Sequence, residues 1–439
     1  MLVKKIVKND IKFKKISWQN PLKIAKIISQ NYQENWTFLY SALHQEKNNS
    51  KSYIALFESQ KYSGNDFKKL QEIIENTDGE MWFGGLNYEV ANQFEHLPKT
   101  AKSFIDINEI FFSKFELILE FHHDKQQLTA IYKNKFFLDK LLEYKLLDEN
   151  YQLPVIKKVS TNFSDKSYKS TINLLKKMIM AGDFFQANLT RKFFGNFPKK
   201  VSQNENFELF LELTKQSPAN YSAFIRFDDN FIISSSPELF LKSRNGKIIS
   251  CPIKGTIKRG KNPQEDRENK KYLQNSLKEK SENLMIVDLV RNDLSRVCEP
   301  SSIKVKKLFN IATYKTIYHL SSEIHGKIAK EFSIFDAIQA CFPAGSMTGA
   351  PKIKSMEVLS GFEKINRGIY SGAIGYLKSN NELNLAVVIR TLIINKDRFE
   401  FQVGGAITFD SDADLELDET YSKASAIMKI LKLKKINFS

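Results

Sequence analysis

The chain has 439 residues, of which 42% are apolar and 26% are charged, and its formal net charge is +16. This apolar fraction suffices for a sizeable buried core, so the composition excludes an intrinsically disordered protein. A basic chain attracts polyanions. The 56 lysines are nevertheless dispersed among acidic residues, whereas a nucleic-acid-binding protein is expected to cluster basic residues beside exposed aromatic ones. We therefore expect no nucleic-acid partner.

Cysteine content and hydropathy indicate a cytoplasmic protein. The three cysteines form no CxxC pair, which argues against a disulfide framework and a zinc site. No run of 18 apolar residues occurs, so no membrane association is expected. All ten arginines lie between Arg191 and Arg398. Specific recognition of anions is therefore expected in the second half of the chain.

The first 150 residues alternate short apolar runs with charged segments, which predicts antiparallel strands with a few helices. The periodicity then lapses, and a boundary is expected that separates an N-terminal region, 1–155, from a second region, 156–439. Directly after it, Ser164 or Asp165 begins a predicted helix that ends at Gly182.

The second region combines pairs of short strands with helices between the pairs. A long charged helix is expected from about Glu265 to Asp293, and a final helix from about Asp414. This order favours α+β layers over strict βαβ alternation.

Two single residues stand out in this region. Lys254, in SCPIKGT, lies between an apolar residue and a glycine just after a predicted strand. Taken alone, such a lysine is most often a solvated side chain. Glu238, in SSSPELFL, lies at a Ser-Pro turn, where an acid usually caps or solvates the turn.

Two pairs of glutamates have i,i+3 spacing, namely Glu279 with Glu282 and Glu416 with Glu419. This spacing places both carboxylates of a pair on one helix face. Most such pairs face solvent, and the alternative interpretation is a metal site.

Several segments occur together in one order along the chain: GDFFQANL, SSSPELFL, PIKGT, ENLMIVDLVRNDLSRV, YHLSSEI, FPAGSMTGAPK, RGIYSGAIGY, VIRT and DSDADLELDETYSKA. In this order they resemble the motifs of the chorismate-utilising enzymes, the family of anthranilate synthase component I, aminodeoxychorismate synthase component I and isochorismate synthase. The resemblance covers about residues 165–430. It implies an α+β fold in which two large facing antiparallel β-sheets form a sandwich flanked by helices, with chorismate bound by region 156–439.

The residue at position 254 separates two branches of this family. Aminodeoxychorismate synthases resemble this chain in having PIKGT, whereas anthranilate synthases usually have PIAGT. The lysine implies covalent catalysis, in which its neutral amine attacks C2 of chorismate and expels the C4 hydroxyl. Ammonia then adds at C4 and expels the lysine, giving 4-amino-4-deoxychorismate for 4-aminobenzoate and folate synthesis. The alternative is an anthranilate synthase component I in which Lys254 is a tolerated variation.

Two further positions carry chemistry in this resemblance. Glu238 matches the general acid that protonates the departing C4 hydroxyl, which is otherwise a poor leaving group. Gln186 matches a position where isochorismate and salicylate synthases have a lysine that activates water. Because a glutamine cannot act as that base, it favours the amination branch.

The resemblance also implies an Mg²⁺ ion on the ring carboxylate of chorismate. Glu282 and Glu419 match its direct ligands, and Glu279 and Glu416 match partners that contact those ligands or reach the ion through water, in keeping with the oxygen ligands that Mg²⁺ prefers. The positions that match substrate-binding residues are Thr256, His319, Tyr370, Arg390, Gly404 and Gly405.

Ammonia is expected from a partner. Its release from glutamine in this pathway needs a Cys-His-Glu amidotransferase, and none of the three cysteines lies in a GxCxG turn. We therefore expect a heterodimer with a separate glutamine amidotransferase subunit.

A candidate tryptophan pocket is expected to involve the N-terminal region. ALFES is similar to the LLES-type segment that lines this pocket in relatives, and SPANYSAF resembles the NPxPYxxF segment that faces it. The residues concerned are Ser59, Asn220, Tyr221 and Ser222. The alternative is two ordinary core strands.

Overall fold

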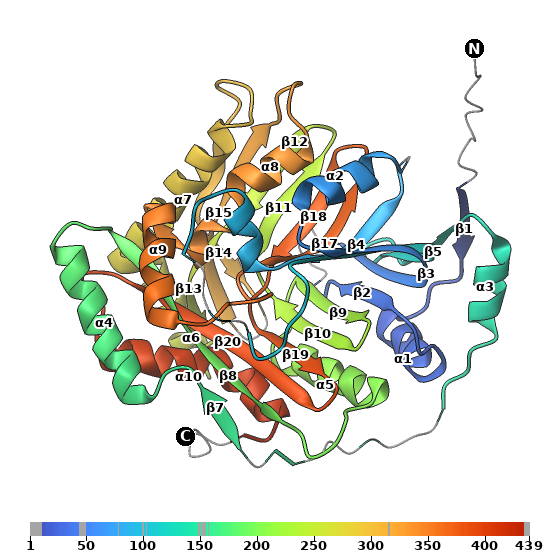
Figure 1. Cartoon of the computed structure of the whole chain (residues 1–439), viewed down its shortest axis with the longest axis horizontal. Helices are drawn as coiled ribbons and strands as arrows, with labels where there is room; N and C mark the ends of the chain where they lie inside the picture. The colour runs from blue at the N-terminus through green and yellow to red at the C-terminus, as the bar shows by residue number, and fades with distance from the viewer. Residues whose placement is uncertain are drawn as a thin grey trace.

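The computed structural model describes residues 11–43, 50–77, 79–98, 101, 103–147, 151, 155–156, 158–314 and 317–433. Its strands form two branches of antiparallel sheet, which share strand β5 (Figure 1). The first branch runs, in order of pairing, through β1 (Lys12–Ile16), β6 (Gln127–Tyr132), β5 (Ile110–His122), β3 (Lys51–Gly64), β2 (Trp36–Tyr40), β9 (Tyr221–Phe227), β10 (Asn230–Ser236), β19 (Thr391–Asn395), β20 (Arg398–Ile407) and β8 (Gln186–Asn196), with β7 (Val159–Thr161) and β16 (Gly349–Ala350) beside β8.

The second branch starts again from β5 and carries most of the sequence motifs. It runs through β4 (Met81–Leu86), β17 (Ala373–Lys378), β18 (Glu382–Val387), β11 (Leu239–Arg244), β12 (Lys247–Cys251), β15 (Ile317–Lys327) and β14 (Lys304–Thr313), and β13 (Ile253–Lys258) also pairs with β15.

Helices surround the two branches (Figure 1). They are α1 (Pro21–Asn31), α2 (Phe67–Glu75), α3 (Lys135–Leu142), α4 (Asp165–Met180), α5 (Gln203–Gln216), α6 (Pro263–Asn275), α7 (Leu277–Ser295), α8 (Ile334–Cys341), α9 (Lys352–Glu363) and α10 (Ala413–Ile430), with the 3₁₀ turns η1 (Tyr88–Gln93) and η2 (Gly345–Met347).

Several clusters of buried apolar side chains hold these elements together. One core joins the first branch to α1, α5 and α10, and a second joins the second branch to α2, α7 and α8. Between the branches, Ile225 and Ile232 of the first pack with Ile374 of the second. Apolar side chains thus fill the space between two facing sheet layers. The expected α+β fold, a sandwich of facing antiparallel sheets flanked by helices, is confirmed.

The predicted helix ends are partly confirmed. Helix α4 begins after Ser164, whose side chain accepts a hydrogen bond from the backbone N–H of Ser167. The single long helix expected from about Glu265 to Asp293 is wrong, because it is divided into α6 and α7 at Ser276. Ser276 has an extended backbone, and its hydroxyl accepts a hydrogen bond from the Glu279 N–H, which starts a new helix.

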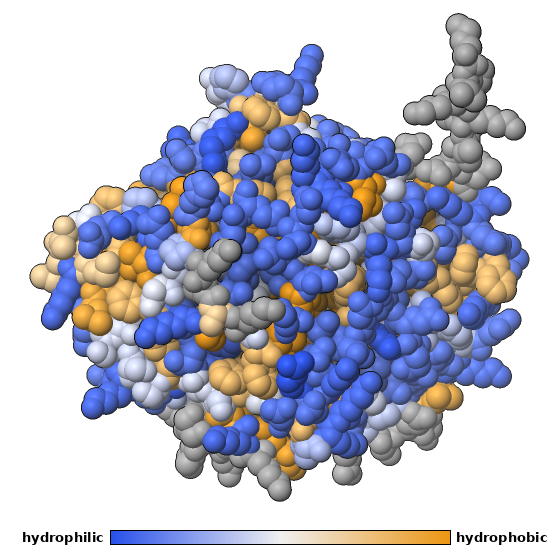
Figure 2. Space-filling model, viewed as in Figure 1, coloured by the Kyte–Doolittle hydropathy of each residue, from blue (hydrophilic) through white to orange (hydrophobic). Residues whose placement is uncertain are grey.

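The two expected regions contribute strands to the same branches. Strand β2 pairs with β9, and β4 pairs with β17. The boundary expected near 155 falls partly on residues 148–150, 152–154 and 157, which lie outside the described residues. No described helix is long and apolar enough to span a membrane. In Figure 2 hydrophilic residues cover most of the visible face, and apolar ones gather over α4 at the left.

Candidate active site

The side chains of Lys254 and Glu238 meet at one buried turn. Lys254, on β13, donates a hydrogen bond of 3.5 Å to the carbonyl oxygen of Ser346 in η2. The hydroxyl of the same serine donates a hydrogen bond of 2.6 Å to Oε1 of Glu238. The next residue, Gly255, has a φ of +79°, and a Cβ there would lie 2.8 Å from Oε2 of Glu279, so a glycine lets β13 lie close to α7. The sequence-predicted nucleophile and acid are therefore brought together.

Glu238 has the environment of an acid that keeps its proton. Burial raises the pKa of its carboxyl group to about 7, against the opposing effects of Ser346 and of the Lys254 ammonium. Arg390 and Tyr370 lie within electrostatic reach of it. Burial lowers the pKa of Arg390, although the charge of Glu238 opposes this, and burial raises the pKa of Tyr370 far above its usual range.

His319 and Thr256 form the next part of the site. They are paired across β13 and β15, and their side chains are linked by a hydrogen bond of 2.7 Å between Thr256 Oγ1 and His319 Nδ1. Burial, and then the charge of Arg390, lower the pKa of His319 to about 3. Its imidazole is therefore neutral at physiological pH.

The four predicted carboxylates gather between α7 and α10. The negative charge of Glu419 raises the pKa of Glu279 and of Glu282, although burial has the larger effect on both. A Cβ on Gly405 would lie 3.1 Å from Oε2 of Glu416, so a glycine lets β20 approach this acid. Oε2 of Glu416 is buried without a hydrogen-bond partner, while its Oε1 accepts from Ser411.

Two lysines lie among these carboxylates. Lys423 Nζ is 2.7 Å from Glu419 Oε1 and donates to the Gly404 carbonyl oxygen, and Lys278 Nζ is 3.6 Å from Glu416 Oε1. Burial raises the pKa of Glu419, but the nearby positive charges, chiefly the Lys423 ammonium, lower it, and the net pKa is below the usual value. No group of three or more His, Cys, Asp or Glu side chains in the described ranges is arranged to hold a metal ion as it stands. Four carboxylates nevertheless supply the oxygen ligands that a hard cation such as Mg²⁺ prefers, and Oε2 of Glu416 has no hydrogen-bond partner that would compete for it.

Gln186 begins β8, beside β16 and therefore a few residues from Ser346. It is fully buried, and neither its Oε1 nor its Nε2 has a hydrogen-bond partner. Leaving a buried amide unpaired is costly.

Sequence reasoning missed a buried arginine beneath the site. The guanidinium of Arg367 makes two hydrogen bonds to Glu363 and donates to the carbonyl oxygens of Met347 and Asn188. The carboxylate of Glu89 accepts the backbone N–H groups of Arg367 and Gly368. Arg367 therefore joins η2 to β8, α9 and η1. Its only signal in the sequence is its place in RGIYSGAIGY. Ser346 and Lys423 likewise lie within quoted segments.

The residues of the expected tryptophan pocket are only partly brought together. Asn220, Tyr221 and Ser222 line a cavity of about 40 Å³ between the branches, with Ser41 at the end of β2. Ser59 does not line it. It lies exposed, several residues further along β3, and donates to the carbonyl oxygen of Lys114. The register of β2 against β9 places Ser41, rather than Ser59, beside the segment SPANYSAF.

Fold and site together define a chorismate-handling protein. The chain belongs to the chorismate binding enzyme family, whose profile matches residues 18–429. It is 32% identical to aminodeoxychorismate synthase component 1 of Salmonella typhimurium over 357 residues, which cover 79% of this chain and 75% of that protein. It is 41% identical over 294 residues to a chloroplastic aminodeoxychorismate synthase of Arabidopsis thaliana, covering 64% of this chain and 32% of the plant protein.

Other relatives belong to neighbouring branches. The chain is 32% identical to anthranilate synthase component 1 of Acetivibrio thermocellus, over 79% of its own length and 74% of that protein's. The crystal structure of anthranilate synthase component I from Streptococcus pneumoniae superposes with a TM-score of 0.77 at 25% identity, covering 88% of this chain and 93% of that one. The menaquinone-specific isochorismate synthase of Escherichia coli, at 14% identity and a TM-score of 0.77, shares the fold, over 96% of this chain and 94% of that one.

Proposed function

We propose that this chain is the chorismate-aminating component of an aminodeoxychorismate synthase. The observation that carries the proposal is the contact of Lys254 and Glu238 with the same residue, Ser346. A nucleophilic amine and a protonated carboxylic acid then face one reaction space, as a displacement at C2 of chorismate with loss of the C4 hydroxyl requires. The names of the bacterial and plant relatives support the same branch.

The reaction proceeds in two displacements. The unprotonated Lys254 amine forms a bond to C2, both ring double bonds shift toward C4, and the C4 hydroxyl leaves as water with the proton of Glu238. Ammonia then bonds to C4, both double bonds shift back, and the lysine leaves C2 as a neutral amine. Ammonia gives up one proton to the Glu238 carboxylate, which restores the acid.

The remaining residues bind and orient chorismate. Arg390 supplies a cation for the second carboxylate of chorismate, beside Tyr370 and the backbone amides of Gly404 and Gly405. The neutral His319, held by Thr256, faces the C4 side of the ring. Burying two carboxylates without such groups would be costly.

Mg²⁺ is the proposed cofactor. Glu282 and Glu419 would hold it directly, Glu279 and Glu416 would support those ligands or reach the ion through water, and the ion would supply a positive charge for the ring carboxylate. The unpartnered Oε2 of Glu416 supports a bound cation near α10. Lys278 and Lys423, which now neutralise Glu416 and Glu419, would keep the acids charged before the ion binds.

Gln186 supports amination over hydration, because its amide cannot take a proton from water. A second candidate is anthranilate synthase component I, favoured by the structural likeness to the pneumococcal enzyme. Aminodeoxychorismate synthesis needs Lys254 as the nucleophile, whereas anthranilate synthesis does not.

We also propose that a separate glutamine amidotransferase subunit supplies the ammonia. Tryptophan is proposed to bind at Asn220, Tyr221 and Ser222, with Ser41 in place of Ser59.

The test is to incubate the protein with chorismate, Mg²⁺ and ammonium and to identify the product by mass. We expect aminodeoxychorismate, and a chorismate-derived adduct on the peptide that contains Lys254. Lys254→Ala should lose both, while the matched variant Lys258→Ala, on an exposed lysine of the same strand, should keep them. Anthranilate as the main product, or wild-type rates in Lys254→Ala, would contradict the proposal.

A further inference from the structure

Both proposed catalytic side chains contact one residue of the turn η2. The Ser346 hydroxyl donates a hydrogen bond of 2.6 Å to Oε1 of Glu238, and the Ser346 carbonyl oxygen accepts one of 3.5 Å from Lys254 Nζ. Ser346 is 5% exposed and Glu238 is 4% exposed. Bulk water therefore does not compete for the hydrogen bond between the serine and the acid.

The turn that carries Ser346 is held from two sides. Arg367 Nη1 donates a hydrogen bond of 2.7 Å to the carbonyl oxygen of Met347. On the side of α7, a Cβ on Gly345 would lie 2.7 Å from Cδ2 of Leu289, so the turn lies close against that helix. Ser346 thus has little freedom to follow a carboxyl group that moves, and its own position determines where Oε1 of the acid lies.

The direction of this hydrogen bond decides which oxygen of Glu238 carries the acidic proton. A serine hydroxyl has one hydrogen to donate. Among the described residues Glu238 is the acceptor of that hydrogen. If Oε1 remains the acceptor when the acid is neutral, the acidic proton lies on Oε2. In the opposite arrangement a protonated Oε1 would donate to Ser346, and the proton would be held by the serine.

We propose that Ser346 is a positioning residue, whose hydroxyl keeps Oε1 of Glu238 as an acceptor in both protonation states and so leaves Oε2 to deliver the proton. This inference rests on the proposed function for the recipient of the proton, which is the C4 hydroxyl group of chorismate. The orientation of the carboxyl group does not depend on that reaction. Because the carbonyl oxygen of Ser346 also holds Lys254, one residue sets the acid and the nucleophile relative to each other.

The hydrogen bond also affects the pKa of Glu238. Burial raises this pKa, and the Ser346 hydroxyl opposes the effect because it favours the carboxylate. The other charged or titratable groups that act on the carboxyl group, or on which it acts, are Lys254, Lys423, Arg390 and Tyr370. Loss of the hydroxyl leaves these groups in place. It should therefore raise the pKa of Glu238 further, whereas loss of a serine that accepts the acidic proton should lower it.

Infrared titration of the whole chain, without substrate, tests the orientation. The C=O stretch of a protonated carboxyl group has a lower frequency when its carbonyl oxygen accepts a hydrogen bond. Burial raises the pKa of Glu89 to about 7 as well, so the band of Glu238 is assigned by its loss in Glu238→Gln. In Ser346→Ala we expect this band at a higher frequency, and its titration midpoint higher by about one pH unit. An unchanged frequency, or a midpoint that stays or falls, would overturn the proposal.

The kinetics of ammonium-dependent amination test the consequence for the reaction. Ser346→Ala should lower kcat about 10- to 100-fold and change KM for chorismate less than about threefold, because the hydroxyl orients the acid and does not bind the substrate. The alkaline limb of kcat/KM should move up with the infrared midpoint. A wild-type kcat, or a loss confined to KM, would overturn the positioning role. If the wild type itself makes no aminodeoxychorismate, the proposed function fails, while the infrared titration still decides the orientation of the carboxyl group.

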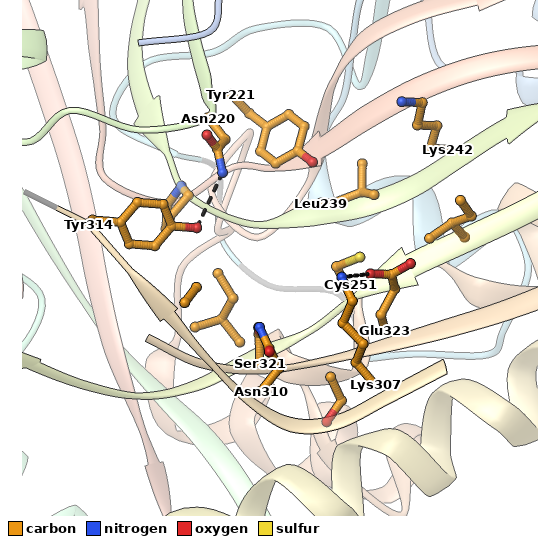
Figure 3. A pocket seen from close by; sticks show the side chains of 15 residues that line it. Asn220, Tyr221, Leu239, Lys242, Cys251, Lys307, Asn310, Tyr314, Ser321 and Glu323 are labelled. Atoms are coloured by element: carbon orange, nitrogen blue, oxygen red, sulfur yellow. Dashed lines mark hydrogen bonds and ion pairs between the residues drawn. The ribbon is translucent and has the colours of Figure 1, made fainter. Parts of the chain in front are cut away.

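Ser321→Ala is the matched control, because it removes the same hydroxyl group from another strand. Ser321 lies on β15 and lines the pocket shown in Figure 3, which is not lined by Glu238, Lys254 or Ser346. This variant should keep the wild-type band, midpoint and kcat, and a shift equal to that of Ser346→Ala would overturn the proposal. Ser346→Cys, whose thiol is a weaker donor, should shift the band and the midpoint in the same direction but less. Thermal unfolding checks that each variant is folded.

Discussion

At the scale of single residues, burial favours in Glu238 the protonated form that its proposed role as an acid requires. Its carboxyl group has a pKa of about 7 because burial disfavours the charged form more than Ser346 and Lys254 favour it. An exposed glutamate would be almost fully ionised at neutral pH. The acid form that the proposed loss of a hydroxyl group needs is therefore populated at neutral pH.

The first prediction concerns pH. Because the protonated form is the active one, kcat/KM for ammonium-dependent amination should fall as pH rises through about 7, after correction for the fraction of free ammonia. Glu238→Gln should lose about 10²–10⁴-fold in rate. Its residual activity should lack this alkaline limb. An unchanged limb in the variant would assign the titration to another group.

Sequence reasoning identified Lys254 and Glu238 separately but not their meeting point. The contact passes through Ser346, which is 108 residues from Glu238 in the chain and lies in a short 3₁₀ turn. Ser59 shows the opposite outcome. The segment that contains Ser59 matched a family motif, but the pairing of β2 with β9 places Ser41 at the cavity instead. Local sequence similarity could not show this, because it carries no information on which residues of two strands are paired.

At the scale of elements, helices α7 and α10 present their acidic faces to each other. Each pair of glutamates was predicted from its i,i+3 spacing, because residues three apart lie on the same face of a helix. The convergence of the two faces was not predictable from spacing, because it depends on how both helices pack against the sheets. The division at Ser276 matters here, since it gives α7 its own start and places Glu279 in its first turn.

The second prediction concerns these helices. Glu282→Gln and Glu419→Gln should each raise the Mg²⁺ concentration needed for half-maximal activity by about tenfold or more, because each variant removes a charge directed at the ion. Excess Mg²⁺ should partly restore turnover. Glu268→Gln, on the exposed face of α6, is the control and should behave as the wild type does. The measurement is activity as a function of Mg²⁺, and equal curves for all three variants would contradict a metal role.

At the scale of the whole molecule, Arg367 connects the layers. It is buried and joins α9, β8 and η2, while Glu89 of η1 holds its backbone. The alternation of strands and helices predicted the fold class, and the resemblance predicted the sandwich. Neither showed that a residue of the N-terminal region supports the turn that contacts Lys254, because such a contact depends on tertiary packing alone.

The third prediction is that Arg367→Met destabilises the protein by about 3–5 kcal/mol, because it leaves the buried carboxylate of Glu363 without its partner. Arg226→Met, at a half-buried arginine of β9 that contacts Gln203, should cost clearly less. Urea unfolding of both variants measures the difference. Equal losses of unfolding free energy in the two variants would contradict a special role for Arg367, because the charge left behind on Glu363 would then cost nothing extra.

The fourth prediction concerns the assembly. The chain alone should aminate chorismate with ammonium but not with glutamine, and should gain glutamine use when an amidotransferase subunit is added. At neutral pH most ammonia is protonated and non-nucleophilic, so direct delivery of NH₃ into a closed site avoids that loss. Glutamine-dependent turnover by the chain alone, in a preparation free of glutaminase, would contradict the two-subunit assembly.

The pairing of β4 with β17 has a consequence for how the protein is made. Trp82 of β4 pairs with Leu377 of β17, so one edge of β4 stays unpaired until a strand much later in the chain has been synthesised. Strand β2 likewise waits for β9. Such distant pairing slows folding and leaves unpaired edges exposed to aggregation. The edge of β4 is therefore open to aggregation in the nascent chain until β17 has been synthesised.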